Sequence, residues 1–182
     1  MGFQAESAGV RCAMNWVDII ALLLSAVAAG FSIWSFFRER TRNRREATIH
    51  AFDKLQTEIL GNDDLSLNKI TPELAGSYVH KHKEFKNSKA YNDQWWTLTE
   101  KLALLEHFSV GINYHTYDLK VLNAMAGNLM IKIWDNLQPI VKHKRNQDDG
   151  KDNYKEFEKM VENIKHLRSK KVVKNRILGK GN

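Results

Sequence analysis

Cysteine and proline are scarce in this sequence, and the alternating pattern of a β-strand is missing. Cys12 is the only cysteine among the 182 residues, so no disulfide can form within the chain. Pro72 and Pro139 are the only prolines, which leaves long stretches without a helix breaker. No run alternates Val, Ile or Thr with polar residues over the length of a strand. These absences favour an all-α fold.

The patterns that mark metal, phosphate or nucleic-acid sites are also missing. The glycines are isolated and form no glycine-rich phosphate loop. His80 and His82 lie two positions apart, so on a helix they point in different directions, and no partner residue completes a metal site. No aromatic residue follows Phe157, which removes the stacking platform of single-strand binders. We therefore expect no metal ion and no cofactor, and the pattern argues against nucleic acid as a partner.

The longest apolar run defines the N-terminal part of the chain. Nineteen consecutive residues, Ile19 to Phe37, carry no charge. A helix of that length measures roughly 28 Å, close to the ~30 Å hydrocarbon thickness of a bilayer. Trp16 and Trp34 lie near its ends, where aromatic rings prefer the headgroup level. The pattern predicts a transmembrane helix over residues 16–37.

Basic residues follow this run directly. Residues 38–46 contain two glutamates and five arginines. The arginines are Arg38, Arg40, Arg42, Arg44 and Arg45. The positive-inside rule then predicts a single-pass protein of the bacterial inner membrane, with the N-terminus outside and the C-terminal domain in the cytoplasm. We expect these arginines to set the topology and to contact anionic lipid headgroups.

Two alternatives concern the first residues. Ala26-Val27-Ala28 has the small-x-small form that a signal peptidase accepts, although the cations lie on the wrong side of the apolar run for a signal peptide. Met14 offers a second translation start, which would remove Cys12 from the working protein. We expect an uncleaved anchor that follows a short extracytoplasmic tail over residues 1–15.

Small residues line one face of the expected transmembrane helix. Their spacings are four, three, four and three residues: Ala21, Ser25, Ala28, Ser32 and Ser35. Small side chains let two helix backbones approach closely in lipid, and serine hydroxyls can bond across the contact. The pattern predicts self-association through the membrane, although Ala and Ser are also common in single spans.

Further helices are expected in the cytoplasm. A basic juxtamembrane helix is expected over residues 38–60, with an apolar stripe that includes Ile49, Phe52 and Ile59. This stripe must pack either on the domain that follows or on the same stripe of a neighbouring subunit. Thr71-Pro72-Glu73 predicts a helix start, and a later helix is expected to end near Pro139. Three apolar stripes mark the remaining helices: Tyr91, Trp95, Leu98, Leu102 and Leu105; Leu119, Leu122, Met125, Leu129 and Ile133; Phe157, Val161, Ile164 and Leu167. We predict a bundle of about four helices, with its domain over residues 61–168.

One turn between two of these helices collects polar residues. It contains Glu106, His107, Gly111, His115 and Asp118. Glu106 and Asp118 could supply the paired carboxylates of acid–base chemistry, whereas such residues more commonly cap helix ends. No catalytic constellation is complete, so we expect no enzyme.

The net charge of +7 is concentrated near the C-terminus. Residues 165–182 contain seven lysines and arginines and no acid. We expect a basic, disordered tail over 169–182. Two alternatives remain: an interfacial helix on an anionic membrane, because Val172, Val173 and Ile177 are interleaved with the cations, and binding to nucleic-acid phosphates.

Short motifs connect the chain to a known family. They are Met14-Asn15-Trp16, Arg45-Glu46-Ala47-Thr48, Leu55-Gln56, Leu104-Leu105-Glu106-x-Phe108-x-x-Gly111, Tyr117-Asp118, Trp134, Pro139-Ile140 and Arg145. Through them the sequence resembles the bacterial membrane-anchored helical family classed as domain of unknown function 4760, from Met14 to about Arg145. The resemblance implies membrane anchoring and an all-helical body, and it implies no reaction.

The sequence as a whole predicts a membrane-tethered interaction or scaffold module that self-associates or binds a protein partner. One alternative is a ligand-sensing or catalytic module that uses the turn between Glu106 and Asp118. A second alternative is a membrane-active effector or toxin. The long cytoplasmic body argues against the second alternative, because a pore former needs little beyond its spans.

Overall fold

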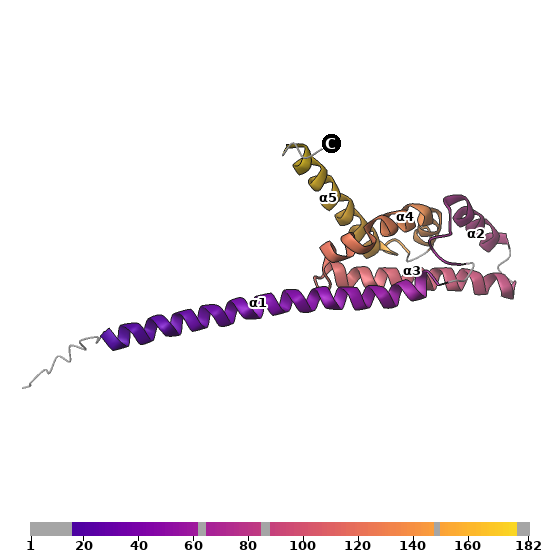
Figure 1. The fold of residues 1–182 in the computed structure, drawn as a ribbon. Helices are drawn as coiled ribbons and strands as arrows, with labels where there is room; N and C mark the ends of the chain where they lie inside the picture. Colours follow the sequence, from indigo (N-terminus) through magenta and orange to yellow (C-terminus); the bar gives the residue numbers. More distant parts are fainter. Residues whose placement is uncertain (1–15, 62–64, 85–87, 148–149, 178–182) are drawn as a thin grey trace, which may run out of the picture. The chain divides into compact units, whose positions relative to one another are not determined.

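The protein is built from five helices and no strand within the residues that the structure describes (Figure 1). The structure, a computed structural model, describes residues 16–61, 65–84, 88–147 and 150–177, and for Asp18, Lys83, Ala90, Tyr91 and 172–177 it describes the backbone alone. The helices are α1 (Trp16–Ile59), α2 (Pro72–Glu84), α3 (Lys89–Asn113), α4 (Leu119–Arg145) and α5 (Lys155–Ile177). The predicted all-α class is confirmed, with four helices after the apolar one. The predicted tail over 1–15, with Cys12 and Met14, lies outside the described residues.

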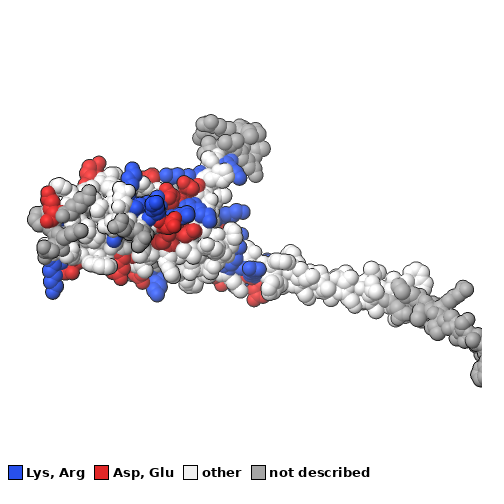
Figure 2. Space-filling view, turned by 180° about the vertical axis from the view of Figure 1, so that it is seen from behind, with Lys and Arg blue, Asp and Glu red and all other residues white. Residues whose placement is uncertain are grey.

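The chain divides into two compact units, residues 1–42 and 43–182. In the first unit, α1 is the one helix of the described residues long and apolar enough to cross a membrane. None of its most apolar window is buried, and Val27 is 69% exposed. Figure 2 shows that the charged side chains gather on the other part of the molecule, while this stretch of α1 is white. An exposed apolar surface of this extent is typical of a site that contacts a membrane or another protein.

The second unit begins inside α1, whose last turns belong to its core. Phe52, Leu55 and Ile59 are buried, whereas Ile49 is 39% exposed. The Phe52 ring lies 6.2 Å from the ring of Phe108 on α3. The apolar stripe after the span therefore packs on the domain that follows it in the same chain. Of the two alternatives expected for this stripe, the following domain and a neighbouring subunit, the structure shows the first.

Helix α2 begins where the sequence predicted. Pro72 is its first residue, and the Thr71 hydroxyl accepts a hydrogen bond from the backbone N–H of Leu74 at 3.3 Å. The backbone N–H of Glu73 and the Thr71 hydroxyl donate to the Glu73 carboxylate and lower its pKa below the ordinary value. The loop before α2 is anchored by Lys101 of α3, whose Nζ donates to the carbonyl of Leu65 at 3.1 Å.

Helix α4 follows α3 after the turn over residues 114–118, and it is longer than expected. The sequence predicted an end near Pro139, whereas α4 continues through Pro139 to Arg145. A proline inside a helix removes one backbone hydrogen bond. Ile140 and Val141 are almost completely buried just beyond it. Burial of these two side chains outweighs the lost bond and keeps the last turns helical.

The buried face of α4 also differs from the predicted one. Met125 was expected in the core but is 44% exposed, while Leu122 and Ile133 are fully buried. The buried stripe passes through Ala126 and Met130 instead of Met125 and Leu129. When apolar residues cover a wide arc of a helix, either side of that arc can face the core. The small side chain of Ala126 suits the side that packs against other helices.

Helix α5 corrects the expected tail. Disorder was predicted from residue 169, but the helix continues to Ile177, and residues 178–182 lie outside the described ones. Its buried residues are Phe157, Met160, Val161 and Ile164, which pack against α3 and α4. The heptad-like spacing identified this half of α5 correctly.

We predict that the two ends of the stripe on α1 contribute unequally to stability. Ile59→Ala removes a fully buried side chain and should lower the free energy of unfolding by about 2–5 kcal/mol. Ile49→Ala, the matched control on the same helix, should cost less than about 1 kcal/mol because its side chain is partly exposed. Urea unfolding of the detergent-solubilised full chain, followed by tryptophan fluorescence, measures both. Equal effects would contradict the packing of α1 in the body.

Candidate functional site

The polar residues of the predicted functional turn lie in two separate environments. Glu106 lies on α3 and contacts the start of α5, whereas Asp118 lies at the start of α4. His107 and His115 are exposed. The structure therefore does not assemble these residues into one site, and the two carboxylates have different partners.

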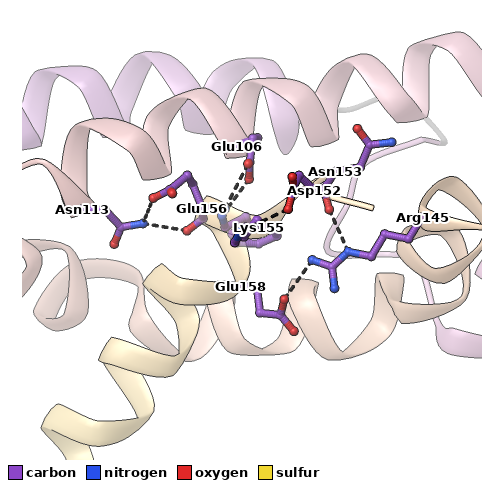
Figure 3. A network of polar contacts seen from close by, with 9 residues as sticks. Glu106, Asn113, Arg145, Asp152, Asn153, Lys155, Glu156 and Glu158 are labelled. Atoms are coloured by element: carbon purple, nitrogen blue, oxygen red, sulfur yellow. Dashed lines mark hydrogen bonds and ion pairs between the residues drawn. The ribbon is translucent and has the colours of Figure 1, made fainter. Parts of the chain in front are cut away.

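Glu106 caps the N-terminus of α5 from another helix (Figure 3). Its Oε1 accepts the backbone N–H of Glu156 at 3.0 Å and its Oε2 accepts that of Phe157 at 2.7 Å. Asn113 donates to the carbonyl of Glu156 at 2.9 Å and to its carboxylate at 2.7 Å. The first N–H groups of a helix have no partner within it, so Glu106 satisfies two of them and its negative charge suits that end of the helix.

Tyr154 lies directly before this helix start. Its backbone has a positive φ of 61°, and its side chain is 9% exposed. Burial, and secondarily the negative charge of Glu106, raise the pKa of Tyr154 to about 12. The phenol is therefore held neutral up to strongly alkaline pH.

Asp118 caps α4 and also contacts α1. Its Oδ1 accepts the backbone N–H groups of Lys120 and Val121 at 2.8 and 3.4 Å. Its Oδ2 lies 3.7 Å from Nε of Arg45. Its own backbone N–H donates to the hydroxyl of Thr48 at 2.7 Å, and Thr48 is fully buried. The cap therefore connects α4 to α1.

Arg44 makes a second connection between α1 and the same turn. Its Nη2 donates to the carbonyl of Tyr117 at 3.2 Å. Of the five arginines assigned to topology and lipid contact, Arg44 and Arg45 thus contact the turn over residues 114–118. Arg38 lies 5.3 Å from the ring centroid of Trp34, and Arg38 and Arg40 are exposed. Arg42, the remaining one, is exposed as well.

Gly111 allows a ring to lie against the backbone of α3. A Cβ at this position would overlap the ring of Tyr117. That ring stacks on Phe108 with centroids 5.3 Å apart. The Gly111 carbonyl accepts the N–H groups of Thr116 and Tyr117 at 2.9 and 3.0 Å. The group that lies close to the backbone at Gly111 is therefore the side chain of Tyr117.

The arrangement of Glu106 and Asp118 is that of helix caps. A general acid or base needs an oxygen that can reach a substrate proton. Both oxygens of Glu106 accept backbone N–H groups, and both oxygens of Asp118 face partners. Across the described ranges, no three His, Cys, Asp or Glu side chains form a group that could hold a metal ion. His80 pairs with Glu84 at 3.2 Å, and His82 stacks on Trp95 with centroids 4.2 Å apart.

The small residues of the span are exposed along α1. The hydroxyl of Ser25 donates to the carbonyl of Ala21 at 2.8 Å, and that of Ser32 to the carbonyl of Ala28 at 2.9 Å. These hydroxyl protons are therefore directed into their own helix, while the oxygens can still accept. Ala21, Ser25, Ala28, Ser32 and Ser35 all remain accessible to a second helix.

Sequence patterns missed one polar cluster. Arg168 of α5 donates from Nε to Oδ1 of Asn123 at 2.7 Å and from Nη1 to Oδ1 of Asn128. The guanidinium crosses α4 over Gly127, where a Cβ would overlap it. A hollow of about 270 Å³ beside it is also lined by Phe52 of α1. Contacts between residues more than 40 positions apart leave no local pattern, and only the isolated Gly127 pointed to a close approach.

The fold and the contacts define an all-helical protein with one candidate membrane-spanning helix and a body held together by helix caps. The sequence model of the family "Domain of unknown function (DUF4760)" matches residues 20–164. The chain belongs to this family. The match includes the packed half of α5 and extends beyond Arg145, where the resemblance was expected to end. No curated protein and no solved structure matches the chain.

We predict that Gly111→Ala destabilises the protein by about 1–3 kcal/mol, because the ring of Tyr117 must move. Gly76→Ala is the matched control on α2, where a Cβ meets nothing within 4 Å. That change should be neutral or should stabilise by up to about 1 kcal/mol, since alanine favours the helix. Urea midpoints of the two variants measure the difference. A Gly111→Ala protein as stable as the wild type would contradict the close approach.

We predict a loss of stability in alkali that depends on Tyr154. Its pKa of about 12 in the folded protein exceeds the ordinary value of 10.0, so folding holds a proton that the unfolded chain releases. The contribution is fully present below pH 10.0 and is lost as the pH rises towards about 12. Tyr154→Phe should lack this component, which is at most about 3 kcal/mol. Unfolding midpoints between these pH values compare the two proteins, and parallel curves would refute the assignment.

Proposed function

We propose that the chain is a single-pass protein of the bacterial inner membrane whose cytoplasmic helical body is an interaction module. The observation that carries this proposal is the exposed apolar surface of α1 over residues 16–37. Core helices with the same length and composition are buried, whereas none of this window is buried. The five arginines after Phe37 favour the cytoplasm for the body by the positive-inside rule.

Self-association through the span is the first part of this function. Ala21, Ser25 and Ala28 lie on one side of α1, and their small side chains allow close helix contact. In lipid, association depends on this packing because the tails are as apolar as leucine. We propose a homo-oligomer whose contacts in the membrane run along this face.

Binding of a protein partner by the body is the second part. Trp96 on α3 and Tyr114 at its C-terminus are each 71% exposed. Large aromatic side chains are enriched among the residues that dominate binding energy at protein interfaces. These two side chains support a role in partner binding, and the occupied carboxylates of Glu106 and Asp118 support a role without catalysis.

We predict that Ala28→Leu reduces self-association of the full chain, because a bulky side chain separates the two backbones. Ala26→Leu is the matched control: it makes the same chemical change, keeps the charge, and lies on the opposite side of the helix. Native mass spectrometry from detergent gives the oligomeric state of each variant. The expected result is an oligomer for wild type and Ala26→Leu and a shift of about tenfold or more towards monomer for Ala28→Leu, since one or two kcal/mol of packing is lost.

Four outcomes would contradict the proposal. A monomeric wild type, or equal behaviour of the two variants, would refute assembly along this face. A bound small molecule on a monomeric wild type would instead favour a ligand-sensing role. Growth arrest with membrane depolarisation on expression would favour the membrane-active effector.

A further inference from the structure

The last part of α5 extends beyond the packed body. Among the side chains of α5 up to Lys171, Ile164 is the last that is fully buried, and Lys170 and Lys171 are exposed. The helix nevertheless continues to Ile177, and Figure 1 shows its end standing away from α3 and α4. Short isolated helices have marginal stability in water. A helical end that projects from the body is therefore suited to binding a partner.

The contacts of α5 give its direction within the body. Phe157 bonds to Glu106 of α3, Ser109 donates to Sδ of Met160 at 3.4 Å, and Asn163 donates to Asn113 at 3.5 Å. Both helices therefore run the same way, towards the turn after α3. That turn is held by Thr48 and Arg44 of α1. The projecting part of α5 is thus directed towards the end of the body that contains Arg44 and Thr48.

The cations of α5 fall into two groups. Lys165 pairs with Asp135 at 3.0 Å, and Arg168 binds Asn123 and Asn128, so both are engaged inside the body. Five further cations follow, with no acid after Glu162: Lys170, Lys171, Lys174, Arg176 and Lys180. Position 174 lies four residues after position 170 and three after position 171, which places it on the same side of the helix as both.

We propose that residues 169–177 bind the anionic headgroups of the membrane in which the chain is anchored. The inference rests on the proposed membrane anchor. Phosphate oxygens complement the positive charge of this segment, whose sequence contains no acid, and their contact relieves the repulsion between neighbouring lysines. Covalent attachment to the span keeps the helix at a high effective concentration near the lipid surface. The family match ends at residue 164, before this surface begins.

The test is hydrogen exchange of the full chain in lipid nanodiscs. One set of discs contains phosphatidylcholine alone, and the other contains phosphatidylcholine mixed with anionic phosphatidylglycerol. We expect amides of residues 169–177 to exchange about tenfold more slowly in the anionic discs, and the protection to disappear at high salt. The variant Lys170→Glu/Lys171→Glu/Lys174→Glu should lose this protection.

A matched control carries the same change of net charge elsewhere. Lys120→Glu/Lys132→Glu/Lys159→Glu alters three exposed lysines within the body and should keep the protection. Exchange of the core amides of α3 and α4 reports in every sample whether the body is folded. Equal exchange of residues 169–177 in both kinds of disc would overturn the inference while leaving the anchor intact.

Two further results separate the remaining possibilities. A chain that fails to co-elute with discs of either composition would refute the membrane anchor, and the inference with it. Protection that appears with added double-stranded DNA or RNA in phosphatidylcholine discs, and not with phosphatidylglycerol, would replace the lipid surface with nucleic acid.

Discussion

Helix α1 must satisfy two different environments along one continuous backbone, and the rest of the structure depends on how it does so. From Ile19 to Phe37 the helix carries no charged residue and none of its most apolar window is buried, whereas Phe52, Leu55 and Ile59 are buried in the body. Helical geometry satisfies the backbone hydrogen bonds in both environments, so only the side chains need to change. The turn after α3 then attaches to α1 where the second environment begins, through the buried hydroxyl of Thr48.

Carboxylates that could serve chemistry are used here to start helices. Glu106 replaces the missing hydrogen bonds at the start of α5, and Asp118 does so for α4. Each acts between elements far apart in the sequence, so the caps also fix which helices are neighbours. Leaving one buried N–H without a partner costs about 1–3 kcal/mol, which is a large share of the stability of a small domain. The functional proposals therefore concern surfaces: the exposed apolar span, Trp96 and Tyr114, and the basic end of α5.

Local sequence patterns predicted the helices correctly but misplaced several of the helix ends. The stripe on α3 was correct at Trp95, Leu98 and Leu102, and the α2 start at Pro72 was correct because capping is local. Pro139 was expected to end α4, and residue 169 was expected to end the ordered part of α5. Both helices continue, the first because Ile140 and Val141 are buried beyond the proline. Burial depends on what lies opposite, which residue spacing does not reveal. Of the candidate site, the sequence predicted the turn and that such carboxylates commonly cap helix ends, but not that Glu106 caps α5 or that Asp118 contacts α1.

The sequence by itself determined the all-helical class, the apolar span and the family, because each depends on residues that are neighbours in the chain or on one helix face. Only the tertiary structure decided which side of α4 faces the core, that Arg168 crosses α4 over Gly127, and that Glu106 meets the first turn of α5. These contacts join residues about 40 to 50 positions apart, as Arg168 with Asn128 and Glu106 with Glu156. A helix periodicity repeats every few residues and is the same whichever distant helix packs against it. Specific pairing arises only when shape and hydrogen bonding are satisfied together in the folded body.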